Sequence, residues 1–217
     1  MIAIRIQANI QVIDSVKDDE DRILILKVAK GNETLTIGCV YDDNRNNTRT
    51  LSKLEELLDR MDARQGLIIA GDYNVIVDET LDQYGYDNNH HQTKAVKIHT
   101  EWEKSGTLVD IYRKKFKKGN PINYVPDTDH NRENPKLGRK LDKFLVSEDL
   151  NIKETEILHI SDNHYKTILN MKKKFDHGAV RLLFNKKKPD IGPGQFKLDP
   201  YLVSCGTLDS VIKEVIY

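Results

Sequence analysis

The amino-acid sequence predicts a mixed α/β protein: a layered sandwich of two mixed, mostly antiparallel sheets flanked by helices, with one sheet incomplete. Three observations predict this fold class. Short apolar runs of strand length recur along the chain, two segments instead carry apolar residues at helical spacing, and no internal repeat divides the chain. The 217 residues are enough for one full domain, or for one domain with a tail.

The first half of the chain begins with strands and continues with a helix. Strands are expected at residues 2–12, 22–28 and 35–41, and a turn at Gly31-Asn32 joins the last two. A helix is expected from about residue 50, because apolar side chains recur there at helical spacing. These side chains are Leu51, Leu54, Leu57, Leu58 and Met61. A buried strand at residues 67–70 follows the helix and ends at Gly71.

The second half contains one further helix and several short strands. The helix is expected at residues 94–104, with Gly106 as its terminator. The expected extended segments are residues 108–111, 122–125, 141–146, 157–160, 166–171 and 179–184. Beyond residue 184 the composition shifts to lysine, proline and glycine. We therefore expect one domain over residues 1–185, and a linker and tail with an amphipathic stretch over residues 186–217.

The composition limits the possible partners. The formal net charge is zero, so nucleic-acid binding would depend on local basic runs, and each such run is also typical of a solvated loop. These runs are residues 113–118, 172–174 and 186–188. No segment approaches the roughly 18 continuous apolar residues of a membrane span. Cys39 and Cys205 are the two cysteines, which favours a reducing, intracellular compartment without a disulfide framework.

Three polar motifs follow or begin apolar runs. Gly71-Asp72-Tyr73-Asn74 comes directly after the strand at residues 67–70, and Asp142 lies in the strand-like segment at residues 139–147. The third motif, residues 175–180, places Asp176 and His177 at the start of the last apolar run. Acidic residues at three strand ends, with one histidine, indicate a site that cleaves phosphodiester bonds.

Each motif also has a plainer interpretation. Asp72 and Asn74 could only cap a turn after a strand, and Tyr41 alone could be an ordinary aromatic residue at a strand end. The histidine-containing segments at residues 88–91 and 161–164 are interpreted as a solvated loop and a turn.

In their order along the chain, these motifs resemble those of the endonuclease/exonuclease/phosphatase superfamily, and more narrowly the endonuclease domain of LINE-type (non-LTR) retrotransposon proteins. Gly-Asp-Tyr-Asn is similar to the family's Gly-Asp-Phe-Asn, and residues 139–147 are similar to its Arg-Leu-Asp-Tyr-Ile-Leu-Val-Ser strand. Residues 175–180 are similar to its closing Ser-Asp-His motif, except that Phe175 stands in place of the serine. Residues 40–44, 108–112 and 192–198 resemble a Val-Tyr-Ala-Pro-Asn loop, a Leu-Val-Asp-Ile-Trp segment and a Gly-Pro-Gly-Tyr-Trp-Lys-Leu tail.

The resemblance implies a deoxyribonuclease-like fold, DNA as the partner, Mg²⁺ or Mn²⁺ as the cofactor, a nuclear location and a tail that leads toward a reverse transcriptase. It also implies roles for individual residues. Asp72 would orient or deprotonate the attacking water, and Asn74 would fix that water or the phosphate. Asp142 would hold the imidazole of His177 in one tautomer and stabilise its charged form, and His177 would contact the scissile phosphate. Asp176 would contribute to the metal site, and Tyr41 and Asn44 would contact the phosphate.

The sequence departs from the family pattern at its beginning. The family opens with a strand that ends in Asn and a second strand whose Glu is the main metal ligand, and neither is found here. The chain is therefore interpreted as lacking the first strands, with an upstream or fused chain completing the sheet and with weakened metal binding. Two hypotheses remain open: an impaired divalent-metal endonuclease, and a catalytically inactive remnant that binds nucleic acid or protein. A third, a small-molecule phosphatase of the superfamily, is less compatible with the retrotransposon-like tail.

Overall fold

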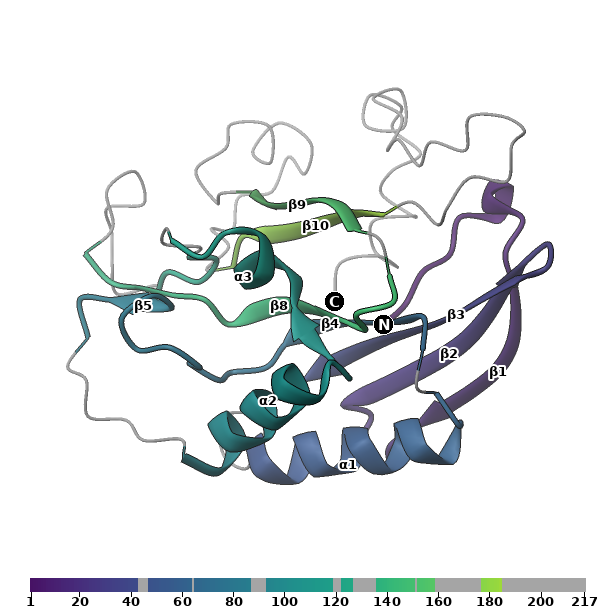
Figure 1. Ribbon diagram of the computed structural model, residues 1–217, viewed down its shortest axis with the longest axis horizontal. Coiled ribbons are helices and arrows are strands. Elements are labelled where there is room, and N and C mark those ends of the chain that lie inside the picture. The colour runs from purple at the N-terminus through teal and green to yellow at the C-terminus, as the bar shows by residue number, and fades with distance from the viewer. Residues whose placement is uncertain are drawn as a thin grey trace.

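The computed structural model describes residues 1–42, 47–63, 65–86, 93–118, 122–126, 136–150, 152–158 and 177–184. Its centre is a six-stranded sheet with the order β1-β2-β3-β4-β8-β6 (Figure 1). The strands are β1 (Gln11–Lys17), β2 (Ile23–Lys30), β3 (Glu33–Tyr41), β4 (Leu67–Asp72), β8 (Asp142–Val146) and β6 (Val109–Asp110). The β3–β4 pair is parallel and every other pair in this sheet is antiparallel.

Two helices cover one face of this sheet. Helix α1 (Asn47–Arg60) makes the connection between the parallel strands β3 and β4, and helix α2 (Thr93–Ser105) lies beside it (Figure 1). The leucines at helical spacing in α1 are at most 2% exposed and pack with Ile23, Ile25 and Ile69 of the sheet. Trp102 joins this core from α2, and its Nε1 atom donates a hydrogen bond of 2.7 Å to Glu55 of α1. The apolar side chains that recur at helical spacing in the sequence thus form the face of α1 that packs into the larger core.

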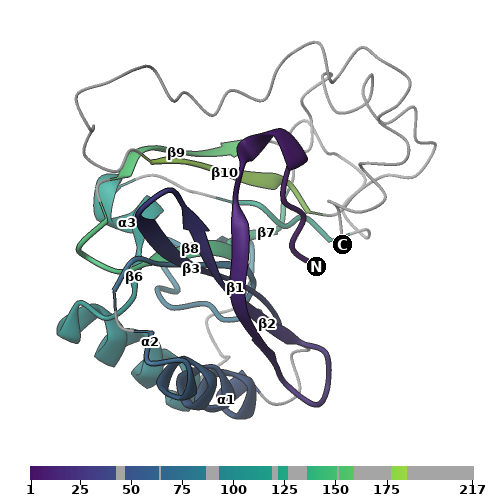
Figure 2. The same ribbon diagram turned by 90° about the vertical axis from the view of Figure 1, so that its right-hand side faces the viewer.

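A second, smaller layer lies on the opposite face of the sheet. Strands β9 (Ile152–Leu158) and β10 (Ala179–Phe184) form an antiparallel pair above β8 and β4, away from both helices (Figures 1 and 2). Leu182 of β10 packs against a cluster that includes Ile68 and Val146 of the central sheet. Short strands β5 (Gln83–Tyr84) and β7 (Gly138–Arg139) form a third antiparallel pair, and helix α3 (Ile111–Lys115) follows β6. The predicted layered α/β sandwich with mostly antiparallel sheets is confirmed.

The structure differs from the prediction at several elements. Residues 2–5 are not a strand, a 3₁₀ turn spans Ile6–Ala8, and β1 begins only at Gln11 because Asn9 adopts a left-handed conformation (φ 55°). Residues 122–125 do not form a strand, although Tyr124 makes isolated bridges to Arg139 and His177. Strand β9 begins earlier than expected, at Ile152. The expected strand at residues 166–171 and the tail at residues 186–217 lie outside the described residues.

Candidate phosphodiesterase site

Two carboxylates face each other where strands β4 and β8 pair. Asp72 is the last residue of β4, Asp142 is the first residue of β8, and the two are directly opposed in the antiparallel register. Directly opposed residues in a sheet project to the same face, so this register places both carboxylates on one side. Burial and, next, the negative charge of Asp142 raise the pKa of Asp72 from 3.8 to about 6. Asp72 is therefore a base that ionises near neutral pH.

This raised pKa predicts a pH-dependent stability difference. The folded protein holds the Asp72 proton more tightly than the unfolded chain, so this stabilisation is present below pH 3.8 and is lost as the pH rises through about 6. Between pH 4 and pH 7.5, the unfolding free energy of Asp72→Asn should therefore rise relative to wild type by roughly 2–3 kcal/mol. Urea unfolding at both pH values measures this change. Asp59→Asn, at an exposed position of α1, is the matched control and should show no such change.

A tight turn after β4 locks Asp72 and Asn74 together. Asn74 is 7% exposed and adopts the left-handed conformation (φ 47°), which asparagine tolerates better than most residues. Its backbone N–H donates to Asp72 Oδ1 at 3.0 Å, and its Nδ2 atom donates to Asp72 Oδ2 at 3.1 Å and also to the backbone carbonyl of Asp42. Asp72 therefore caps this turn, and the two hydrogen bonds fix the direction of its carboxylate.

His177 completes a four-residue group at this end of the sheet. Its Nδ1 atom lies 2.8 Å from Asp142 Oδ2, and the two side chains are 33% and 19% exposed. The imidazole also lies beside the Tyr124 ring, with 4.9 Å between the ring centroids. This contact fixes the position of the ring relative to the Asp142 carboxylate. Residues 72, 74, 142 and 177 thus come together from three segments that are distant in the sequence.

Asn123 organises the site, although the sequence analysis placed it in a short extended segment and gave it no role. Its side chain is buried, and its Oδ1 atom accepts hydrogen bonds from the backbone N–H groups of Leu141 (2.8 Å) and Asp142 (3.1 Å). Its Nδ2 atom donates to the Asp142 carbonyl at 2.6 Å, and its own carbonyl accepts from Gly178 at 2.6 Å. One asparagine therefore fastens the Asp142 strand to the His177 segment. Its position before Tyr124 in an otherwise polar loop was the only available signal.

The remaining predicted residues have different placements. Tyr41 ends β3 and pairs with Asp72 in the parallel register, but its side chain is 58% exposed. Asn44 and Asp176 lie outside the described residues, as does the segment at residues 88–91. Within the described part of the chain, no group of three or more His, Cys, Asp or Glu side chains is arranged to hold a metal ion.

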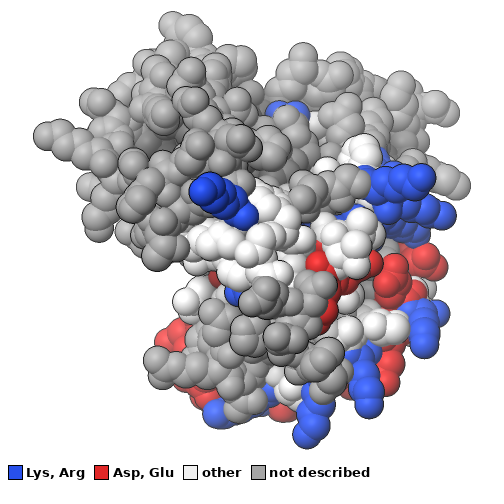
Figure 3. Space-filling view, turned by 90° about the vertical axis from the view of Figure 1, so that its left-hand side faces the viewer, with Lys and Arg blue, Asp and Glu red and all other residues white. Residues whose placement is uncertain are grey.

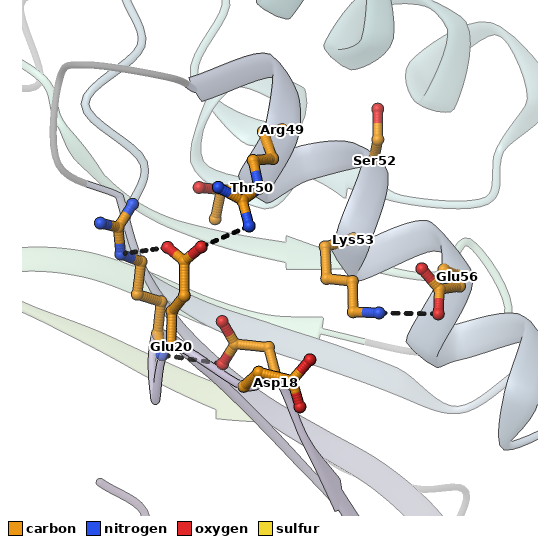
Figure 4. A pocket seen from close by; sticks show the side chains of 9 residues that line it. Asp18, Glu20, Arg49, Thr50, Ser52, Lys53 and Glu56 are labelled. Carbon is orange, nitrogen blue, oxygen red and sulfur yellow. Dashed lines mark hydrogen bonds and ion pairs between the residues drawn. The ribbon is translucent and has the colours of Figure 1, made fainter.

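A surface pocket of about 350 Å³ between the β1–β2 turn and α1 lies apart from this site (Figure 4). All of its basic groups are paired: Glu20 contacts Arg49 at 2.6 Å and Arg22 at 3.3 Å, and Lys53 contacts Glu56 at 2.7 Å. The remaining charged residues of its wall are Asp18 and Asp19. Because its basic groups are already paired, this pocket is not a candidate functional site.

The described surface carries both signs of charge. Basic and acidic side chains are interspersed on the described part of the face in Figure 3. In the basic run at residues 113–118, Arg113 turns inward to Asp82, and Lys114 pairs with Glu148 at 2.9 Å. Among the described residues, no helix is long and apolar enough to cross a membrane.

The arrangement of sheets and helices matches that of solved structures. The endonuclease domain of TRAS1, a telomere-specific non-LTR retrotransposon, superimposes with a TM-score of 0.53 and 12% identity, covering 81% of this chain and 70% of that domain. The catalytic domain of Xenopus laevis APE2 superimposes with a TM-score of 0.51 and 17% identity, covering 76% of this chain. The chain shares the fold of these two domains.

The superposition covers a smaller share of the APE2 catalytic domain than of the TRAS1 endonuclease domain. This chain spans 55% of the APE2 catalytic domain, so about half of that domain has no counterpart in the superposition. No family model matches the sequence, and no curated protein matches it. At these identities the likeness shows the fold alone, and the chemistry has to be argued from the site itself.

Proposed function

We propose that this chain carries a divalent-metal-dependent site that hydrolyses phosphodiester bonds in DNA, and that residues 1–217 alone act slowly. The observation that carries the proposal is the distance of 2.8 Å between His177 Nδ1 and Asp142 Oδ2. Asp142 is the first residue of β8 and lies opposite Asp72 of β4. A base that ionises near neutral pH, next to an oriented imidazole, suits the activation of water and the stabilisation of a charged phosphate. The retrotransposon origin and the nuclear location remain parts of the same proposal.

Each described residue has a separate role in this reaction. Above a pH of about 6, ionised Asp72 accepts a proton from the attacking water. Asn74 keeps the Asp72 carboxylate in position through its two hydrogen bonds. Protonated His177 interacts with a phosphate oxygen through Nε2 while Asp142 holds Nδ1, and this charge meets the negative charge that develops on phosphorus. Tyr41, exposed at the same end of the sheet, lies where it can contact the nucleic acid.

The metal ion would add charge neutralisation at the phosphate. The described side chains do not form a metal centre by themselves, since no cluster of three ligands is arranged among them. Asp176, the predicted ligand, adjoins His177 but lies outside the described residues. One or two carboxylates can hold Mg²⁺ together with several waters, but loosely. The proposed slow rate follows from this small ligand set.

Nicking of supercoiled plasmid DNA tests the proposal. Purified chain should convert plasmid to open circles slowly with Mg²⁺ or Mn²⁺, and addition of EDTA should stop the conversion. The Asp72→Asn variant is expected to be at least 10²-fold slower, because its side chain cannot accept a proton from water, whereas Asp59→Asn should match wild type. Conversion that persists in EDTA, or that is equal in Asp72→Asn, would refute this assignment.

The alternative is a catalytically inactive remnant that binds nucleic acid or protein. It is favoured by the absence of a three-ligand cluster among the described residues. It predicts that plasmid DNA is retarded in a gel by the chain but stays uncut at every Mg²⁺ and Mn²⁺ concentration. The two proposals therefore give different results in the same reaction tubes.

A further inference from the structure

Lys143 is a buried cation on the far side of strand β8 from the candidate site. It follows Asp142 directly, so its side chain projects to the helix-covered face of the sheet. Its side chain is 2% exposed, and its Nζ atom donates to the backbone carbonyl of Val75 at 2.5 Å. Among the described residues, no carboxylate lies within 4.0 Å of this ammonium group. A buried charge without a counter-charge is costly, so a neighbouring anion would be favourable.

A cavity of about 300 Å³ adjoins Lys143. Its wall includes two further polar groups, His99 of α2 and Arg113 of α3. His99 is 6% exposed, its ring is held edge-on between Tyr73 and Trp102, and its Nε2 atom has no hydrogen-bond partner in the described structure. The Nη1 atom of Arg113 is also buried without a partner there. Lys143, His99 and Arg113 thus border one space, and two of them have unused hydrogen-bonding capacity.

Asp82 and Asp110 also line the cavity, and both carboxylates already have partners. Asp82 contacts Arg113 and accepts from the backbone N–H of Asp78 at 3.2 Å. Asp110 contacts Lys140 and accepts from the backbone N–H groups of Tyr112 (3.1 Å) and Arg113 (3.2 Å). These bonds leave Lys143 as the uncompensated charge. Burial, and next the charge of Lys140, lower its pKa to about 8, against the attraction of Asp82, Asp110 and Asp72, so it stays mostly protonated at pH 7.

We propose that this cavity binds a small monocarboxylate, with its oxygens accepting hydrogen bonds from Lys143, His99 and Arg113. The apolar part of the wall, Val77, Leu108 and Leu145, would contact a short hydrocarbon chain. Glu103, which is exposed, and Asp78 also border the cavity, and their charges disfavour dianions such as phosphate. His99 is neutral, because burial lowers its pKa well below the ordinary value, and it donates in the tautomer with the proton on Nε2.

Titration of the full chain with sodium propionate tests this proposal, with sodium chloride at equal ionic strength as the reference. Propionate should shift the amide NMR signals of residues around the cavity, such as Val77 and His99, along one saturable curve. Sodium phosphate at the same ionic strength should not reproduce these shifts. Lys143→Met should weaken propionate binding about tenfold or more, because a charge-assisted hydrogen bond is lost. Lys97→Met, at an exposed lysine of α2, is the charge-matched control and should bind as wild type does.

Two results would overturn the proposal. Shifts that rise linearly with propionate, or that are spread over the surface, would mean that there is no site. Equal saturation by phosphate would mean that the cavity does not select a monocarboxylate. Both readouts come from the wild-type chain, so the test remains valid if Lys143→Met does not fold.

Discussion

Replacement of His177 by alanine is expected to slow DNA nicking by about 10²–10⁴-fold. The imidazole is oriented by Asp142 at 2.8 Å and lies at the end of the sheet that presents Asp72. Alanine removes the cation that meets charge on the phosphate, while the backbone bridge between Tyr124 and residue 177 can remain. The rate is measured as open-circle formation from supercoiled plasmid, in which a single nick per molecule is visible.

Two comparisons determine how His177 acts. If Asp142 works through the imidazole, Asp142→Asn combined with His177→Ala should be no slower than His177→Ala alone, because the two residues act as one unit. If His177 protonates the leaving oxygen, its loss should matter much less for bis(p-nitrophenyl) phosphate, whose leaving group needs no proton. Additive losses in the double variant would contradict the pairing, whatever the substrate.

The second large effect is expected at Lys140. Its side chain is 1% exposed and contacts Asp110 directly, with Asp82 at 4.0 Å. Lys140→Met should reduce the free energy of unfolding by about 3 kcal/mol, because it leaves the largely buried Asp110 carboxylate without its cation, while Asp82 keeps Arg113. Lys114→Met is the control: the Lys114–Glu148 pair is about half exposed, so its loss should cost less than about 1 kcal/mol. Urea unfolding of both variants at pH 7 measures the difference.

A compensating variant separates the electrostatic cause from simple loss of packing. Lys140→Met with Asp110→Asn removes the cation and one of its carboxylates together, and it should recover part of the loss. If the double variant were as unstable as the sum of both single variants, packing of the lysine stem would be the cause instead.

The sequence was most informative where short-range patterns determine structure. Helices α1 and α2 were predicted within a few residues, because their apolar spacing matches one buried face. Strands β2, β3, β4 and β10 were predicted similarly, because each is a continuous or alternating apolar run. The two-residue strands β5 and β7 were not predicted, since a pair this short has no pattern of its own.

Within the candidate site, motif residues were easier to find than the residues that support them. Asp72, Asn74, Asp142 and His177 belong to short segments with a recognisable order, and the structure brings them together. Asn123 was missed because its bonds reach 18 and 19 residues along the chain, and no local pattern records such contacts. The catalytic roles themselves remain predictions, since distances alone do not measure chemistry.

The alternation of side chains along β8 has a consequence for how this sequence can diverge. Asp142 and Lys143 are neighbours in the chain but occupy opposite faces of one sheet layer. A one-residue shift of β8 against β4 would exchange the two faces, turning the Asp142 carboxylate to the helix-covered interior and the Lys143 ammonium group to the face that carries Asp72. Homologues of this protein should therefore differ here by substitution only, and an alignment that requires a gap in β8 would mark a chain that has lost both sites at once.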